Sequence, residues 1–242
     1  YMINSSLYSS PAVYRGILYI GANDSCIYAL NAENGTLIWK YETRGSVRSS
    51  PAISEVGKRV NYFPYFIEDI VYVYVGSDDG NIYAIDAKTG TLRWKYNTGG
   101  PVRSSPIVKR QIVYVGSCDG CLYALNSKTG ALVWKYQTGD SIISSPAMSD
   151  EIVYVGSFDK NIYALDARNG TLIWKYETND VIVSSPAIFH EVVYVCTWNG
   201  CVYALNSKNG ELKWKYEIKG IISSSPAVTE ELIYITACDG CI

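Results

Sequence analysis

Two closely spaced cysteine pairs are the residues of this sequence whose types and spacing most directly suggest chemistry. Cys118 and Cys121 flank an Asp-Gly dipeptide, and Cys238 and Cys241 do the same. One such pair supplies half of the ligands of a tetrahedral zinc site, or the two thiols of a redox disulfide. Asp-Gly, however, is a strong signal for a tight hairpin turn, and the two pairs lie three copies apart in the repeat described below. That separation is too great for one metal ion, and we predict no metal site.

Arg48 and Arg103 form a second candidate site, because each directly precedes a Ser-Ser-Pro motif. Two guanidinium groups on neighbouring loops can hold one anion through paired hydrogen bonds. The other copies of the motif have different residues at this position, namely Tyr8, Ile143, Val183 and Ser223. The sequence therefore predicts an anion site at the two arginines, and the alternative is two solvated arginines on a surface loop.

The sequence offers little for acid–base or nucleophilic catalysis. His190 is the single histidine, and it lies beside Glu191 in a predicted surface turn. A serine triad needs a histidine close to a nucleophile and a carboxylate, and no such set converges on His190. No phosphate-binding loop or protease motif is found. We predict no catalytic residue.

These candidate residues lie within a tandem repeat of about forty residues. Ser-Ser-Pro motifs begin at Ser9, Ser49, Ser104, Ser144, Ser184 and Ser224, and Trp-Lys-Tyr triplets begin at Trp39, Trp94, Trp134, Trp174 and Trp214. Both markers recur every 40 residues, with one interval of 55 in the second copy. Two independent markers thus predict six copies in one domain, 1–242, with an insertion between about residues 54 and 70.

Each copy predicts four short strands. In the fourth copy these are residues 145–148, Ile152–Ser157, Asn161–Leu165 and Leu172–Glu177, rich in β-branched and aromatic residues. Asp-Gly or Asn-Gly turns between the second and third strands indicate hairpins. Four antiparallel strands in about forty residues are typical of a propeller blade. We therefore predict an all-β β-propeller of four-stranded antiparallel blades, with about six repeats.

The third copy carries a family resemblance. Residues 114–126, with Thr129, Gly130 and Trp134, combine a Gly-x-x-Asp-Gly turn, a Tyr-Ala-Leu-Asn strand, a Thr-Gly turn and a tryptophan four residues later. This pattern resembles the pyrroloquinoline quinone (PQQ) type of β-propeller repeat, and the resemblance covers nearly the whole chain. It implies a structural role between neighbouring blades for five tryptophans: Trp39, Trp94, Trp134, Trp174 and Trp214.

The resemblance leaves the number of blades open. Tyr1 is in register with Tyr41, and Ile242 is in register with Leu122, so the array starts in a fourth strand and stops in a third. Quinoprotein propellers of this family have eight blades. The six copies are therefore expected to be either a segment of a larger ring or a closed ring of six.

For the alternative that the chain is an enzyme, the resemblance also implies a cofactor. Quinoprotein dehydrogenases hold PQQ and Ca²⁺, with an aspartate base and two adjacent cysteines near the quinone. This sequence has no adjacent cysteines, and no aspartate aligns with the base. If PQQ with Ca²⁺ binds, Arg48 and Arg103 are its expected site, because PQQ carries three carboxylates.

Composition excludes some partners. The formal net charge is −2, which gives no electrostatic case for nucleic acid. No apolar run reaches the roughly 18 residues of a transmembrane helix. Seven cysteines, an odd number, favour a reducing compartment, although the resembling family is often periplasmic or extracellular.

The remaining candidates are aromatic residues that depart from the repeat. The insertion contains Tyr62, Phe63, Tyr65 and Phe66, and Trp198 precedes the Asn-Gly turn of the fifth copy. Aromatic side chains exposed on a rigid scaffold are candidate partner contacts, and the alternative for the insertion is a hairpin that packs on its own blade. We predict a non-enzymatic scaffold that binds a protein or peptide. The alternatives are a PQQ-dependent oxidoreductase domain and a structural module of a cell-surface array.

Overall fold

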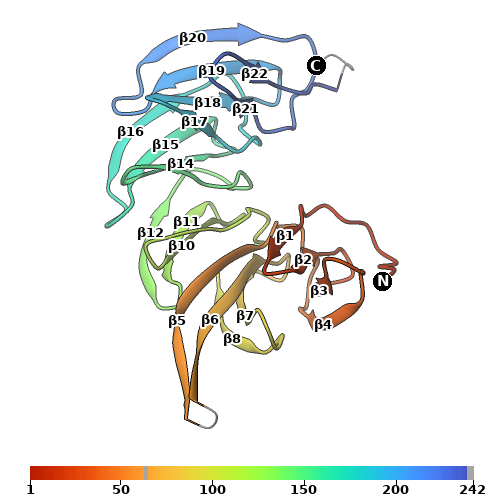
Figure 1. Cartoon of the computed structure of the whole chain (residues 1–242). Coiled ribbons are helices and arrows are strands. Elements are labelled where there is room, and N and C mark those ends of the chain that lie inside the picture. Colours follow the sequence, from red (N-terminus) through yellow and green to blue (C-terminus); the bar gives the residue numbers. More distant parts are fainter. Residues whose placement is uncertain (63–64, 239–242) are drawn as a thin grey trace. The chain divides into compact units, whose positions relative to one another are not determined.

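Strands make up the regular structure of this chain. The computed structural model describes the backbone of residues 1–62 and 65–238 and, apart from residues 59–68, the side chains of these ranges. Within them, five four-stranded sheets and one two-stranded sheet form, and no helix occurs, so none could cross a membrane (Figure 1). Antiparallel four-stranded sheets that follow one another along the chain are propeller blades. The predicted all-β propeller class is confirmed.

The chain divides into two compact units, and the first comprises Tyr1–Tyr114 and residues 124–133. It holds two complete blades in which each strand pairs with the next in sequence. Their strands are β1 (Ala12–Tyr14), β2 (Ile17–Gly21), β3 (Cys26–Asn31), β4 (Leu37–Glu42), β5 (Ala52–Tyr62), β6 (Tyr65–Gly76), β7 (Asn81–Asp86) and β8 (Leu92–Asn97).

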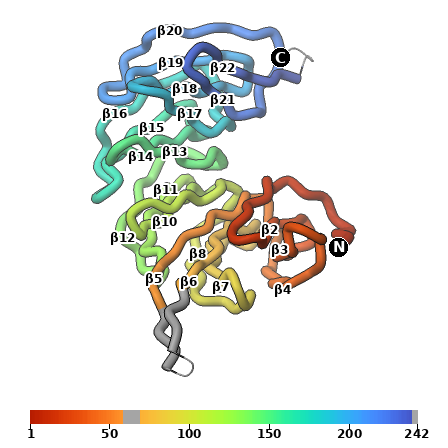
Figure 2. Tube along the Cα trace, viewed as in Figure 1, coloured from red at the N-terminus to blue at the C-terminus, as the bar shows by residue number. Residues whose placement is uncertain are grey.

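The second unit comprises residues 115–123 and 134–242. It holds two complete blades and a two-stranded sheet, and Figure 2 follows its chain path from β13 to β22. The strands are β13 (Ala147–Ser149), β14 (Ile152–Gly156), β15 (Asn161–Asp166), β16 (Leu172–Glu177), β17 (Ala187–Phe189), β18 (Val192–Cys196), β19 (Cys201–Asn206), β20 (Leu212–Glu217), β21 (Ala227–Val228) and β22 (Ile233–Tyr234).

One further blade has residues in both units. Its sheet order is β12-β11-β10-β9. The strands are β9 (Ile107–Lys109), β10 (Ile112–Gly116), β11 (Cys121–Asn126) and β12 (Leu132–Gln137).

The middle strands of a blade are buried on both faces, which explains their apolar sequences. In the β14–β15 hairpin, Tyr154 lies opposite Ala164 and Val155 lies opposite Tyr163, and all four residues are buried. The fourth strand covers only one side, so its side chains alternate. Trp174 of β16 is buried between two exposed neighbours. Hydrophobic runs in the middle strands and alternation in the outer strand are therefore the expected pattern of stacked sheets.

The repeated tryptophan joins one blade to the next in four of the five copies that carry it. The indole Nε1 of Trp39 donates to the carbonyl oxygen of Ala87 at 2.9 Å, and its ring lies against Gly90. A Cβ at Gly90 would lie 2.8 Å from that ring, so only glycine fits this turn, where φ is +70°. The same arrangement recurs in three further pairs, Trp94 with Ser127, Trp134 with Ala167 and Trp174 with Ser207.

Both serines of the Ser-Ser-Pro motif have a structural task. The first serine ties the first strand to the second: Ser49 Oγ accepts from the Gly76 N–H at 2.7 Å and donates to its carbonyl oxygen at 3.0 Å. The second serine links neighbouring blades, because the Ser50 N–H donates to Ser105 Oγ at 2.8 Å. In the second unit, the Ser145 N–H binds Ser185 Oγ in the same way, at 2.9 Å.

The inserted residues of the second copy lengthen two strands. The β5–β6 ladder runs from Ala52 opposite Tyr74 to Tyr62 opposite Tyr65, with a bulge between Glu55 and Gly57. In Figure 1 this hairpin extends beyond the rest of its blade. The inserted residues of β5 pair with those of β6, so the 15 extra residues leave the repeat undisturbed on either side.

Candidate functional site

Two positions vary strongly between copies and lie at the same end of each blade, and we call them the rim. The first rim position precedes Ser-Ser-Pro and comprises Tyr8, Arg48, Arg103, Ile143, Val183 and Ser223. The second lies two residues after the end of the second strand in the first five copies. With its equivalent in the sixth copy, it comprises Asn23, Asp78, Cys118, Phe158, Trp198 and Cys238. A backbone hydrogen bond holds the two rim positions side by side. The Asp78 N–H, for example, donates to the carbonyl oxygen of Ser46, two residues before Arg48, at 2.9 Å.

The rim of the first unit is charged. Arg48 Nε lies 3.3 Å from Asp78 Oδ2, and Arg103 Nε lies 2.9 Å from Asp78 Oδ1. The guanidinium of Arg48 also lies over the Tyr8 ring, 5.5 Å from its centroid. The two arginines singled out from the sequence are thus brought together, but on a shared carboxylate that the sequence reasoning missed. The equivalence of Asp78 to Trp198 in the repeat was the signal that could have found it.

Asn23 is the equivalent of Asp78 in the first copy. Its Oδ1 atom is buried and has no hydrogen-bond partner among the described residues. A buried acceptor without a partner normally calls for a donor from water or a ligand. This rim therefore presents acceptors as well as guanidinium donors.

Part of the rim of the second unit is apolar. Ile143, Phe158, Val183 and Trp198 occupy four of its positions, and Trp198 is 41% exposed. The other positions carry Cys118, Ser223 and Cys238. The Phe158 N–H donates to Ser141 O and the Trp198 N–H donates to Val181 O, each at 2.9 Å, as at Asp78. These bonds hold Phe158 beside the loop that carries Ile143, and Trp198 beside the loop that carries Val183.

Ca²⁺ ligands are not grouped beside the two arginines among the described residues. Among residues with described placement, no group of three or more His, Cys, Asp or Glu side chains could hold a metal ion. Asp78, the carboxylate nearest to the two arginines, is already bound to both. The arginine pair alone could bind a single carboxylate by displacing or sharing Asp78.

Cys118 occupies the second rim position of the third copy and is half-buried, whereas Cys121 is buried. Cys121 Sγ donates to Gln137 Oε1 at 3.0 Å. Of the second pair, Cys238 is exposed, and Cys241 lies outside the described residues. His190 sits in the turn between β17 and β18, with its ring 4.1 Å from the Phe189 ring.

The aromatic residues of the insertion lie at the end of the β5–β6 hairpin. Tyr62 and Tyr65 oppose each other as its last ladder pair, and Phe66 pairs with Asn61. The side chains of Tyr62, Tyr65 and Phe66 lie outside the described residues, as does Phe63 entirely. Their proposed role in partner binding stays a prediction.

A second set of polar contacts joins blades at the turns between the second and third strands. Asp79 Oδ2 accepts from the Tyr83 hydroxyl at 2.6 Å and from the Arg44 N–H of the preceding blade at 2.9 Å. Asp159 does the same with Tyr163 and the Gly139 N–H, at 2.6 and 2.7 Å. Burial raises the pKa of each carboxyl, but these hydrogen bonds outweigh burial and hold both pKa values below the usual range. The Asp-x-x-x-Tyr spacing in the first four copies was the sequence signal for this pair.

Two family models match the chain. One, described as the β-propeller of the β-alanine-activating enzyme, matches residues 72–242, and the other, described as the PQQ β-propeller domain of glucose/ethanol/alcohol dehydrogenase, matches residues 2–111. The chain belongs to the β-propeller family that the first of these models describes, because that model covers more than half of the chain. The second model confirms the resemblance to PQQ-type repeats.

Curated relatives match only part of this propeller. The dehydrogenase subunit of the quinone alcohol dehydrogenase of Gluconacetobacter polyoxogenes is 34% identical over 94 residues, which are 38% of this chain and 12% of that protein. The outer membrane protein assembly factor BamB of Escherichia coli strain K12 is 29% identical over 101 residues, 40% of this chain and 24% of that protein. Each match spans a quarter or less of the relative, and the two relatives belong to different functional classes.

The fold of the propeller also has a close designed counterpart. The crystal structure of the computationally designed Ika8 protein superposes with a TM-score of 0.81, covering 96% of this chain and 68% of that chain at 16% identity. At this identity, the likeness concerns the fold alone.

Proposed function

We propose that this propeller is a non-enzymatic scaffold that binds a protein or peptide through the apolar part of the rim of its second unit. The observation that carries the proposal is that Ile143, Phe158, Val183 and Trp198 place apolar side chains at four rim positions. The same two positions carry Arg48, Asp78 and Arg103 in the first unit, so the apolar choice is not a requirement of the blade. The match to an outer membrane assembly factor is consistent with a binding role.

The rim suits recognition because its side chains stand on a fixed backbone. Phe158 and Trp198 are each held by a backbone hydrogen bond to the neighbouring loop. A preorganised aromatic side chain loses little conformational entropy on binding. Tryptophan is also among the residues that most often dominate the energy of an interface. We therefore expect Trp198 to be the anchor of the bound peptide.

Selection of peptides from a display library tests this proposal. Peptides that bind the wild-type protein should lose about tenfold or more in affinity on Trp198→Ser and on Phe158→Ser. The double variant Arg48→Gln/Arg103→Gln is the matched control, because it changes the same rim positions in the other unit. Binding that survives both aromatic substitutions but fails in the control would place recognition at the charged rim.

A second candidate function is a PQQ-dependent oxidoreductase domain. What favours it is the convergence of Arg48 and Arg103, since guanidinium pairs bind carboxylates well. Titration with PQQ and Ca²⁺, followed by quinone absorbance and a dye-linked alcohol assay, tests this function. A true site should weaken about tenfold in Arg48→Gln/Arg103→Gln and strengthen in Asp78→Asn, which removes the competing carboxylate. Absence of binding and of turnover in the wild type would eliminate this candidate.

A further inference from the structure

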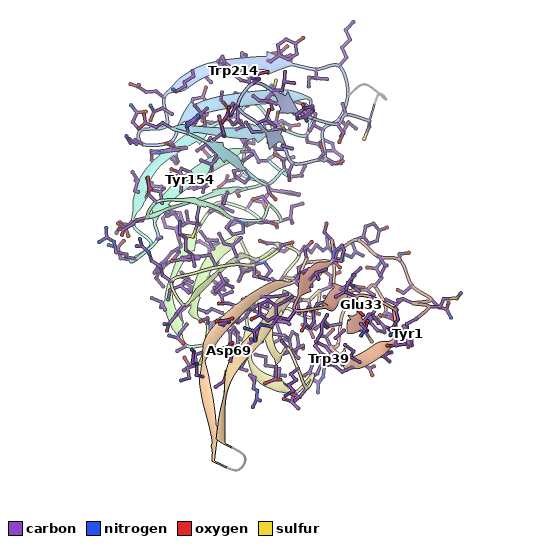
Figure 3. All side chains as sticks on the ribbon, in the orientation of Figure 1. Tyr1, Glu33, Trp39, Asp69, Tyr154 and Trp214 are labelled. Atoms are coloured by element: carbon purple, nitrogen blue, oxygen red, sulfur yellow. The ribbon has the colours of Figure 1, made fainter. Side chains whose placement is uncertain are left out.

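A cavity of about 280 Å³ lies in the first unit, between the β1–β2 turn and the base of the inserted hairpin. Tyr14, Ile17 and Tyr19 line it from the first blade, and Asp69 and Val71 of β6 line it from the second. Figure 3 labels Asp69 on this strand. We propose that the cavity binds a small uncharged aromatic molecule that carries a carboxamide-like group. This binding site is separate from the rim and goes beyond the proposed scaffold function.

An aliphatic residue and the inserted hairpin together create the cavity. Ile17 lies opposite Asn31 at the end of the third strand, as Tyr72 lies opposite Asp86 in the second blade, so the two positions are equivalent. The later blades also have aliphatic residues there, and only the second blade departs from this pattern. Tyr72 is buried and occupies the space beside its own second strand, whereas Ile17 leaves that space open. The inserted hairpin then adds Asp69 and Ile70 as a side wall.

The floor of the cavity is apolar because its polar atoms are already bonded. The Ala87 carbonyl oxygen accepts from the Tyr19 hydroxyl at 3.1 Å and from Trp39 Nε1 at 2.9 Å. Asp86 is bound to Arg93 at 2.7 Å and to Thr89. An aromatic ring is the ligand group that suits a floor with aliphatic and tyrosine walls.

The mouth of the cavity carries one ion pair. Arg15 Nη2 lies 2.7 Å from Asp69 Oδ2 and 3.4 Å from Glu55 Oε1, and the Tyr14 hydroxyl donates to Glu55 at 2.7 Å. The pair presents N–H donors next to a carboxylate acceptor, which complements the oxygen and NH₂ of a primary carboxamide. Hydrogen bonds to charged groups are among the stronger ones available to a neutral ligand.

Charge balance at the cavity argues against an ionic ligand. Three cationic side chains, Arg15, Lys88 and Arg93, stand among three carboxylates, Glu55, Asp69 and Asp86. A single added charge would meet as many like charges as opposite ones, besides losing its own hydration. A neutral polar group avoids both costs.

Ligand-observed NMR titration with benzamide, benzoate and benzamidine tests the site. These three ligands share one ring and differ in charge. We expect benzamide to bind with a dissociation constant of about 1 mM, the usual range for a ligand of this size, and both ions to bind at least about fivefold more weakly. Equal binding of all three ligands, or none by benzamide, would overturn the proposal.

Substitutions locate the binding. Ile17→Tyr copies Tyr72 of the second blade, so the strand tolerates it, and it should abolish benzamide binding by filling the cavity. Ile112→Tyr makes the same change at the equivalent position of β10 and should leave binding unchanged. Arg15→Met keeps the apolar stem, removes the donors and should weaken binding about fivefold. Benzamide binding that persists in folded Ile17→Tyr and Arg15→Met proteins would place the ligand elsewhere.

Discussion

At the scale of single residues, the aspartates in the turns between the second and third strands connect stability to pH. Asp79 and Asp159 each accept hydrogen bonds from a tyrosine of their own blade and from a backbone N–H of the preceding blade. Burial raises the pKa of each carboxyl, and the hydrogen bonds more than compensate, so the folded-state pKa values are lowered. A lowered folded pKa means stabilisation that is complete above the usual aspartate pKa, about 4, and lost as pH falls below it.

Replacement of both aspartates should therefore flatten the acid side of the stability profile. We expect Asp79→Asn/Asp159→Asn to lower the free energy of unfolding at pH 7 by about 1 to 2 kcal/mol per site. Its stability should then fall less steeply than that of the wild type between about pH 5 and pH 2. Urea unfolding at several pH values measures both effects. The chain itself shows that asparagine is compatible with this turn, because Asn199 stands there in the fifth copy. Parallel pH profiles for wild type and variant would contradict the assignment.

At the scale of elements, the strands were predictable and the contacts between blades were less so. Predicted residues Leu172–Glu177 coincide with β16, because alternation and turn residues are local signals. Asp78 was missed because its partners, Arg48 and Arg103, belong to neighbouring copies, and a single sequence does not show which side chains meet across blades. The aromatic residues of the insertion also did not indicate by themselves whether it forms a loop or the long ladder of β5 and β6.

The two serines of Ser-Ser-Pro should differ in their contribution to stability. Ser49 is buried, and its hydroxyl bonds both the N–H and the carbonyl oxygen of Gly76. Ser49→Ala would leave both backbone groups without partners and should cost about 2 to 3 kcal/mol. Ser105 is only half-buried and accepts the Ser50 N–H, so Ser105→Ala should cost about 1 kcal/mol or less. Denaturant unfolding compares the two variants, and a larger loss in Ser105→Ala would contradict this division of roles.

At the scale of the whole molecule, the blade-joining tryptophans report which blade faces are covered. Trp174 is 7% exposed, and its Nε1 donates to the Ser207 carbonyl oxygen of the next blade at 2.9 Å. Trp214 holds the same position in the fifth copy, but it is 41% exposed (Figure 3). The other residues of β20 are exposed as well. Both residues belong to the second unit and hold equivalent positions of the repeat, so the effects of truncating them can be compared directly.

Truncation of these two tryptophans should have unequal effects. Trp174→Ala removes a buried ring and a hydrogen bond and should lower the free energy of unfolding by about 3 to 5 kcal/mol. Trp214→Ala removes a ring that remains largely in water, so we expect a loss of about 1 kcal/mol or less. Urea unfolding at two protein concentrations measures both. If Trp214→Ala were as costly as Trp174→Ala, the Trp214 face would be covered in solution. A cost that rises with protein concentration would identify a second copy as the cover, because association stabilises by mass action.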